Sequence, residues 1–419
     1  MSHTTASIAS SGQSVEHRSP PARSYFPALD GLRAISFLGV FAWHYLGLPY
    51  GWAGVDVFFV LSGFLITGIL FDTQDDPHRF RNFYIRRTLR IFPLYYAVLL
   101  GIFLVTPVFR WNWTWQWIAW PLYLGNFLRF LYPHLNNNFI RAFADASLVS
   151  TSHPLVSLHL GHFWTLCVEE QFYLLWPWIV FTVRDRRKLM AICVACILVV
   201  PVARSYAMAH LPIALVRGEV VLHSTPFRFD TLLLGALIAL LYRGSHRRQM
   251  QRVAQVTLTL SSVGAMWVAA YWFRFQDSTV NRAVADHPWM LTLVALSAGS
   301  LMLRTLVPGT VPYRMFNVRW LRSIGTVSYG AYVFHDIFHS QYSRFLSHRL
   351  TSPVSVVLLT AALGLVTTLA MAFLSYYFFE YPILRLKGSF YAQAHPRTLF
   401  GKPTSESPRK QVEREPWRG

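Results

Sequence analysis

ALDGLRAISFLGVFAWHYLG, residues 28–47, is an apolar stretch of the length that crosses a bilayer, with ionisable groups near both ends. Asp30 and Arg33 lie near its start and His44 near its end. In a helix of about 1.5 Å rise per residue, Arg33 and His44 share one stripe and lie about 16 Å apart. Ionisable groups are costly inside a spanning helix, so both are functional candidates. Alternatively, Arg33 reaches a headgroup and His44 caps the helix at the opposite interface.

The composition is that of a membrane protein. It is 53% hydrophobic and 16% aromatic but only 14% charged, whereas soluble domains carry about a quarter charged residues. The net charge of +19 would suggest nucleic acid in a soluble chain. Here the arginines cluster in short segments between apolar stretches, as the positive-inside rule predicts. We therefore expect membrane lipid as a partner and no nucleic acid.

Ten apolar stretches are predicted to cross the membrane. If both termini are cytoplasmic, these ten crossings place every strongly basic segment on the cytoplasmic side of the membrane. An eleventh, 113–131, is rich in tryptophan and would invert the later basic loops if it crossed, so it is predicted to be interfacial or re-entrant. The crossing stretches are 28–47, 54–71, 89–107, 163–182, 189–209, 227–242, 254–273, 288–306, 323–342 and 353–379, and the basic segments are 79–90, 184–188, 243–252, 304–322 and the tail.

The predicted fold class is an all-α polytopic membrane protein with one membrane domain, residues 26–387. Residues 1–25 are polar and lack the apolar core of a signal peptide, so they are expected to be a disordered cytoplasmic lead. Residues 388–419 are expected to be a disordered basic tail. Residues 132–162 become an outer loop or cap. No metal site is predicted, because the three cysteines lie in apolar segments without further ligands nearby.

The polar residues of the predicted spans fall into two layers. The cytoplasmic layer holds Asp30, Arg33, Arg87 and Arg90, and the last two are three residues apart and share a helix face. Guanidinium groups gathered in this way suit phosphate or carboxylate. The alternative is that these arginines belong only to the positive-inside signal.

The outer layer is predicted to hold a histidine together with carboxylates. This combination suits general base catalysis, in which the acid orients the imidazole, and equally a proton relay in a transporter. The residue types leave both alternatives open. The members of this layer are His44, Asp56, Glu169, Arg228, Asp230 and His335.

The chain resembles the acyltransferase-3 family of integral membrane O-acyltransferases from about Phe26 to Lys387. The most specific combination is DGLRA with a histidine eleven residues after the arginine, then RxxR, then WTLxVEEQFY. The motifs that carry the resemblance are ALDGLRAISFLGVFAWHY, GVDVFFVLSGFLIT, FYIRRTLRIFPLYY, FWTLCVEEQFYLLWP, FRFDTLLLGALIA, SYGAYVFH and FFEYPILRL.

The resemblance implies transfer of an acyl group, commonly acetyl, from cytoplasmic acyl-CoA to a hydroxyl of an extracytoplasmic saccharide or lipid. It implies a multi-pass protein of the bacterial inner membrane, in the stand-alone form without a hydrolase-like domain. The protein partners that we expect are a second copy of the chain or proteins of glycan synthesis. The family's essential histidine falls on His44, its first-helix arginine on Arg33 and its fifth-span glutamate on Glu169. Its arginine pair falls on Arg87 and Arg90.

The two layers give the resemblance a mechanism. The phosphates of CoA would stay at the cytoplasmic arginines, while the pantetheine arm reaches toward His44. His44 would deprotonate the acceptor for direct attack on the thioester, or itself become acylated. Glu169 or Asp56 would fix its tautomer. Contacts to the acceptor are expected from Trp164, Arg228, Asp230 and His335. The rival prediction is a secondary transporter or flippase that uses the same buried charges.

Overall fold

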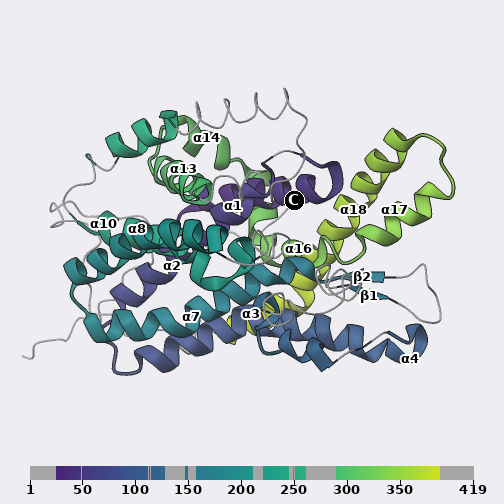
Figure 1. The fold of residues 1–419 in the computed structure, drawn as a ribbon, viewed down its shortest axis with the longest axis horizontal. Coiled ribbons are helices and arrows are strands. Elements are labelled where there is room, and N and C mark those ends of the chain that lie inside the picture. Colours follow the sequence, from purple (N-terminus) through teal and green to yellow (C-terminus); the bar gives the residue numbers. More distant parts are fainter. Residues whose placement is uncertain are drawn as a thin grey trace, which may run out of the picture.

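The computed structural model describes residues 25–386 apart from 49, 112, 114, 128–146, 150–156, 211–219, 245–248, 250 and 261–288. These residues are mostly helical (Figure 1). The α-helices are α1 (Pro27–Leu46), α2 (Ala53–Asp72), α3 (Arg79–Leu104), α4 (Thr106–Phe109), α7 (Trp164–Val183), α8 (Arg186–His210), α10 (Phe229–Tyr242), α13 (Met290–Thr305), α14 (Val311–Phe316), α15 (Arg319–Thr326), α16 (Ser328–Phe334), α17 (His339–Ser347), α18 (Pro353–Ser375) and α19 (Tyr381–Arg385).

Short elements join the helices. The 3-10 turns are η1 (Trp115–Ala119), η2 (Gly125–Phe127), η3 (Gly161–Phe163) and η4 (Thr225–Arg228), and a π turn, η5 (Tyr376–Glu380), links α18 to α19. Strands β1 (Ser147–Val149) and β2 (Ser157–His159) pair antiparallel, with Leu148 opposite Leu158.

The predicted all-α membrane class agrees with this structure. Within the described residues, five helical segments are long and apolar enough to cross a bilayer: Ala53–Asp72, Arg79–Leu104, Arg186–His210, Thr225–Tyr242 and Pro353–Arg385. Helix α13 is a shorter apolar helix. Apart from Tyr25, the predicted lead 1–25 lies outside the described residues, as do the tail 388–419 and most of the predicted cap 132–162.

Two helical segments differ in extent from the sequence expectation. The basic segment 79–90 is the first part of α3 rather than a loop, because arginine is a good helix former. The predicted span 323–342 is broken into parts of α15, α16 and α17. Its first part, α15, packs closely on α1, since a Cβ on Gly325 would lie 1.8 Å from the backbone oxygen of Asp30.

The segment predicted not to cross, 113–131, shows no membrane-length helix in its described part. It forms the turns η1 and η2 instead. The side chain of Gln171 on α7 anchors this segment, because its Nε2 donates to the backbone oxygen of Tyr123 at 2.7 Å and to Asn126 Oδ1 at 2.9 Å.

Helices α2 and α10 form the centre of the bundle through close backbone contact. A Cβ on Gly63 would lie 1.8 Å from the oxygen of Leu232, and one on Gly235 would lie 2.1 Å from the oxygen of Val60. Small residues at such an interface allow membrane helices to pack tightly.

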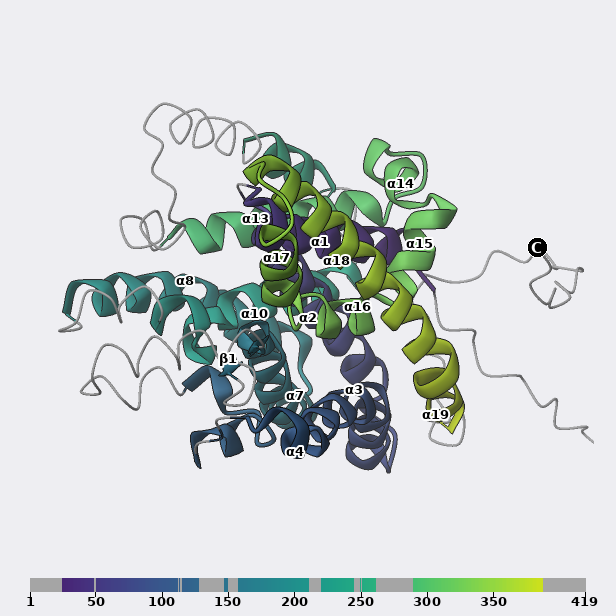
Figure 2. The same ribbon diagram turned by 90° about the vertical axis from the view of Figure 1, so that its right-hand side faces the viewer.

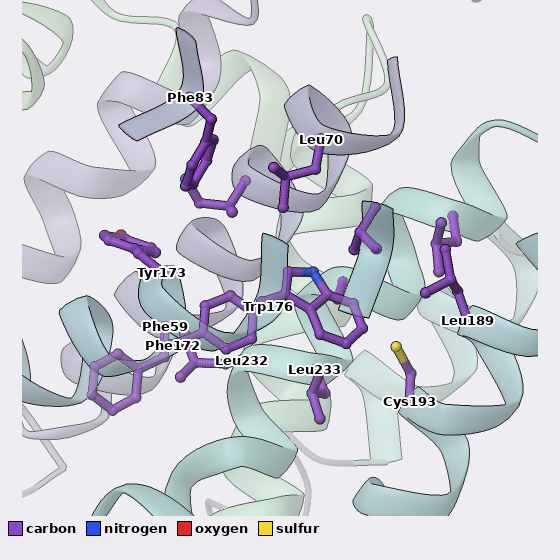
Figure 3. Close-up of a cluster of buried hydrophobic side chains, with 14 of the residues drawn as sticks. Phe59, Leu70, Phe83, Phe172, Tyr173, Trp176, Leu189, Cys193, Leu232 and Leu233 are labelled. Carbon is purple, nitrogen blue, oxygen red and sulfur yellow. The ribbon is translucent and has the colours of Figure 1, made fainter. Parts of the chain in front are cut away.

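Aromatic and aliphatic side chains of α2, α3, α7, α8 and α10 form a buried cluster (Figure 3). Trp176 lies in its middle, stacked on Phe172 with 5.7 Å between the ring centroids. The indole Nε1 donates to Thr67 Oγ1 at 2.8 Å. This packing fixes α7 against α2, and both helices contribute to the site below.

Helix α1 begins with Pro27 at its first position, where a proline costs no hydrogen bond, and ends at Gly47, whose φ of 63° is left-handed. It contacts α2, α15, α16 and α18, and in Figure 2 α18 runs across α1 and α16. The turn between α16 and α17 contacts β2, because the His159 N–H donates to the oxygen of Ile337 at 3.4 Å. This turn carries the second half of the site.

Candidate functional site

One pocket collects the predicted cytoplasmic arginines. Arg33 from α1, Arg87 and Arg90 from α3 and Glu169 from α7 all line it, and its empty volume of about 820 Å³ is partly open to solvent. We call this the arginine pocket; its further polar lining comes from Ser62, Thr165, Tyr173, Ser328, Tyr329 and Tyr332.

Contacts around the arginine pocket hold its cations in place. Arg33 Nη1 donates to Asp30 Oδ1 at 2.8 Å. The guanidinium carbon of Arg87 lies 5.4 Å from the ring centroid of Tyr173, whose hydroxyl is 2.5 Å from Ser62 Oγ. The pocket therefore presents several cations and one carboxylate beside apolar walls, a surface suited to an anionic ligand with an apolar arm.

A second group, the histidine cluster, surrounds Asp336 in the turn between α16 and α17. His44 Nδ1 lies 3.7 Å from Asp336 Oδ1, and His162 Nδ1 lies 3.8 Å from Asp336 Oδ2. His339 Nδ1 is 3.7 Å from Asp336 Oδ1. The His335 ring centroid is 5.1 Å from that of His44. Three imidazoles from three parts of the chain thus lie within 3.8 Å of one carboxylate, and the His335 ring lies beside that of His44.

His162 precedes α7 and is almost fully buried. Its Nε2 lies 3.0 Å from the backbone oxygen of Val333. Burial lowers the pKa of His162 to about 3, so its ring is neutral at neutral pH. A neutral histidine can accept a hydrogen bond at one ring nitrogen while it donates one from the other.

Tyr332 and Thr165 separate the arginine pocket from the histidine cluster. Both line the pocket, and the Thr165 hydroxyl donates to the Tyr332 hydroxyl at 2.9 Å. The Tyr332 hydroxyl in turn donates to the backbone oxygen of His162 at 3.2 Å, and its ring centroid lies 5.2 Å from that of His335. The pocket wall therefore contacts the cluster directly.

A third polar group is a buried ion-pair network. Arg228 Nη2 donates to Asp56 Oδ1 at 2.6 Å, and Arg204 pairs with Asp230. All four side chains are at most 2% exposed. The Arg228 guanidinium also lies 5.9 Å from the ring centroid of Trp164. This network ties α8, η4 and α10 to α2 and α7.

The structure divides the predicted outer layer among these three groups. His44 and His335 lie together in the histidine cluster. Glu169 lines the arginine pocket instead, and Asp56 is paired with Arg228. Trp164 and Asp230 belong to the ion-pair network. The catalytic and binding roles assigned to these residues stay predictions.

Sequence reasoning missed Asp336, His162 and Arg204. Asp336 directly follows the motif SYGAYVFH, so a carboxylate next to a candidate histidine was a visible signal. His162 stands just before the motif FWTLCVEEQFYLLWP, within a segment predicted to be a loop. Arg204 lies inside a predicted span, where any charge calls for a partner.

Comparison with known proteins defines the class. Residues 26–377 match the family described as an acyltransferase domain. The chain is 28% identical over 382 residues to the peptidoglycan O-acetyltransferase OatA of Listeria monocytogenes, covering 86% of this chain and 56% of that protein. It is 29% identical over 387 residues to the putative peptidoglycan O-acetyltransferase YrhL of Bacillus subtilis, covering 86% and 55%. No solved structure matches the chain.

The family match covers most of the chain, so this protein belongs to the acyltransferase family. The predicted family and enzyme class, an acyltransferase, are confirmed. The chain spans a little over half the length of the curated relatives that it matches.

Proposed function

We propose that this protein is a membrane O-acyltransferase of the bacterial inner membrane. It moves an acetyl group from acetyl-CoA on the cytoplasmic side to a hydroxyl of an extracytoplasmic cell-wall saccharide. The names of the bacterial relatives support both the group transferred and the acceptor class. The observation that carries the proposal is the contact of the arginine pocket with the histidine cluster through Tyr332 and Thr165.

Arg33, Arg87 and Arg90 would hold the phosphates of CoA, because phosphate is strongly disfavoured in hydrocarbon and pairs well with guanidinium. The pantetheine arm would lie along the apolar wall toward Tyr332. Arg33 and His44 lie about 16 Å apart along α1, a separation comparable to the length of that arm.

His44 accepts the proton of the acceptor hydroxyl, whose oxygen attacks the thioester carbon. The C–S bond breaks, and the CoA thiolate takes the proton from the imidazolium, leaving an ester and free CoA. An acyl-histidine is the second route, and it would accumulate radiolabel on the protein when acceptor is absent.

The experiment uses purified protein reconstituted in lipid vesicles, with radiolabelled acetyl-CoA and soluble peptidoglycan fragments. We expect label on the glycan hydroxyls and one free CoA thiol for each ester formed. Label that crosses a vesicle membrane without any ester forming would instead support the transporter alternative. Arg349→Ala serves as a control, because Arg349 lies outside the pocket and packs over Phe345.

The proposal includes ten crossings with both termini cytoplasmic. The loop charges support this topology, and the short turns η1 and η2 fit a segment that stays on the outer side. A cysteine at Asn137, in a background with Cys196→Ser because Cys196 is partly exposed, should react with an impermeant maleimide added to intact cells. A cysteine at Ser245 should be protected. The reverse pattern would overturn the ten-span topology.

A further inference from the structure

The Asp336 carboxylate lies close to the Nδ1 atoms of three histidines that come from separate elements. We infer that Asp336 is a positioning residue for His44, holding its imidazole with the proton on Nδ1 so that Nε2 receives the proton of the acceptor. This inference rests on the proposed function, because it assigns the orientation of the base in that reaction. Neither the family match nor the names of the relatives refers to this carboxylate.

The geometry places one carboxylate oxygen toward each of the two relevant rings. Oδ1 is 3.7 Å from His44 Nδ1, and Oδ2 is 3.8 Å from His162 Nδ1. Both N···O separations are somewhat longer than the roughly 2.9 Å of an ordinary N–H···O hydrogen bond. Catalytic hydrogen bonds without substrate are often long in this way and tighten when substrate binds.

The His162 ring shows how protons are arranged in the cluster. A backbone oxygen only accepts, so His162 Nε2, at 3.0 Å from the oxygen of Val333, carries a hydrogen. In the neutral ring Nδ1 is then a bare acceptor, and it has no hydrogen-bond partner among the described residues. It faces Asp336 Oδ2, so a favourable contact requires one proton between these two acceptors. His162 and Asp336 therefore share a proton on the Oδ2 side.

With Oδ2 committed to His162, Oδ1 remains as an acceptor for His44. A neutral His44 that donates from Nδ1 to Oδ1 keeps its Nε2 lone pair for the acceptor hydroxyl. The opposite tautomer would place two acceptors against each other. His339 lies at the same distance from Oδ1, but its ring packs tilted against Tyr45 with 4.3 Å between centroids, and it begins α17 rather than lying on α1.

The turn that carries Asp336 is held firmly. Tyr45, the neighbour of His44 on α1, donates from its hydroxyl to the backbone oxygen of His335 at 2.7 Å. His335 Nδ1 donates to the backbone oxygen of Tyr332 at 2.7 Å. The Asp336 side chain is only 12% exposed. The carboxylate is thus fixed relative to α1, as a positioning residue must be.

The test compares Asp336→Ala with Asp336→Asn in purified protein, measuring acetyl transfer, acetyl-CoA affinity and Tm. Alanine removes the orienting acceptor, and we expect kcat to fall about 100-fold, within the contribution of a general base. Asparagine can accept from His44 through Oδ1 and donate to His162 through Nδ2. It keeps the orientation but cannot become a carboxylate as the His44 imidazolium forms, so we expect a smaller loss of about 10-fold.

Acetyl-CoA affinity should stay at the wild-type value in both variants and Tm in Asp336→Asn, while Asp72→Ala, which removes a carboxylate paired with Arg243, should transfer normally. Wild-type kcat in folded Asp336→Ala, a loss of about 100-fold or more in Asp336→Asn, or a parallel loss of acetyl-CoA affinity would overturn the inference. The asparagine variant decides the matter if alanine prevents folding. His44→Ala separates the two claims. If it abolishes transfer while the Asp336 variants are fully active, only this inference fails; if His44→Ala is itself fully active, the proposed role of His44 fails.

Discussion

The ion-pair network and the histidine cluster are both buried polar groups, but they differ in how closely their charges are paired. In the network, Asp56 lies at hydrogen-bond distance from Arg228, and Asp230 is paired with Arg204. In the cluster, the histidine nitrogens nearest Asp336 lie 3.7 to 3.8 Å away. Closely paired charges hold helices together. A cluster whose groups are not locked in short ion pairs can bind and release protons. We therefore expect stability to depend on the ion-pair network and catalysis on the histidine cluster.

The largest effect on stability is expected in the network. Asp56→Ala leaves Arg228 buried without its counter-charge, which should lower the free energy of unfolding by about 3–5 kcal/mol. Thermal unfolding of the purified protein in detergent measures this loss. Asp72→Ala is the matched control, because its partly exposed pair with Arg243 should contribute only about 0–1 kcal/mol. A stable Asp56→Ala protein that has lost transfer would contradict this assignment and would support the catalytic role predicted for Asp56.

A smaller effect, on donor binding, is expected in the arginine pocket. Arg87→Ala and Arg90→Ala should each weaken acetyl-CoA binding by about 1.5–3 kcal/mol if each loses a charge-assisted contact to phosphate. Lysine should rescue only part of this loss, because it cannot offer the paired N–H groups of a guanidinium. Isothermal titration with the purified variants and with Arg349→Ala makes the comparison. Wild-type affinity in the double variant would mean that these arginines serve only membrane topology.

The smallest effect is expected at the wall between pocket and cluster. Tyr332→Phe removes the hydroxyl that contacts Thr165 and the backbone of His162, at a cost of about 1 kcal/mol. Turnover should fall a few-fold while acetyl-CoA affinity stays unchanged. Tyr96→Phe is the control, since that hydroxyl donates to the backbone oxygen of Pro121 away from the site. Equal turnover in both variants would argue against a role for this wall in transfer.

Sequence predicted well what depends on local geometry. Arg33 and His44 share α1 as their spacing requires, and Arg87 and Arg90 share a helix and line the same pocket as Arg33. The helical class also followed from the apolar stretches, because a chain that crosses hydrocarbon must pair its backbone groups internally.

Contacts between distant segments could not be predicted in this way. Asp56 pairs with Arg228, which lies 172 positions away in the sequence. The local sequence around Asp56 therefore could not show that it pairs with Arg228 rather than lying beside His44. Asp336 reaches His44 only because α15 and α16 pack on α1, which also breaks the predicted span 323–342. Glu169 was assigned to the outer layer by its depth in the span, whereas the face that α7 presents to α2 and α3 decides which group it joins.

The central claim is that His44 acts in transfer while the arginine pocket holds the donor, and both can be measured in one sample of His44→Ala. The substitution leaves a good helix former in α1, so the protein should fold. Transfer to the glycan should fall by at least about 100-fold, the lower range for loss of a general base. Acetyl-CoA affinity should equal that of the wild type, because the phosphates are held about 16 Å away. Retained transfer, or a loss of acetyl-CoA binding in proportion to the loss of turnover, would contradict the claim.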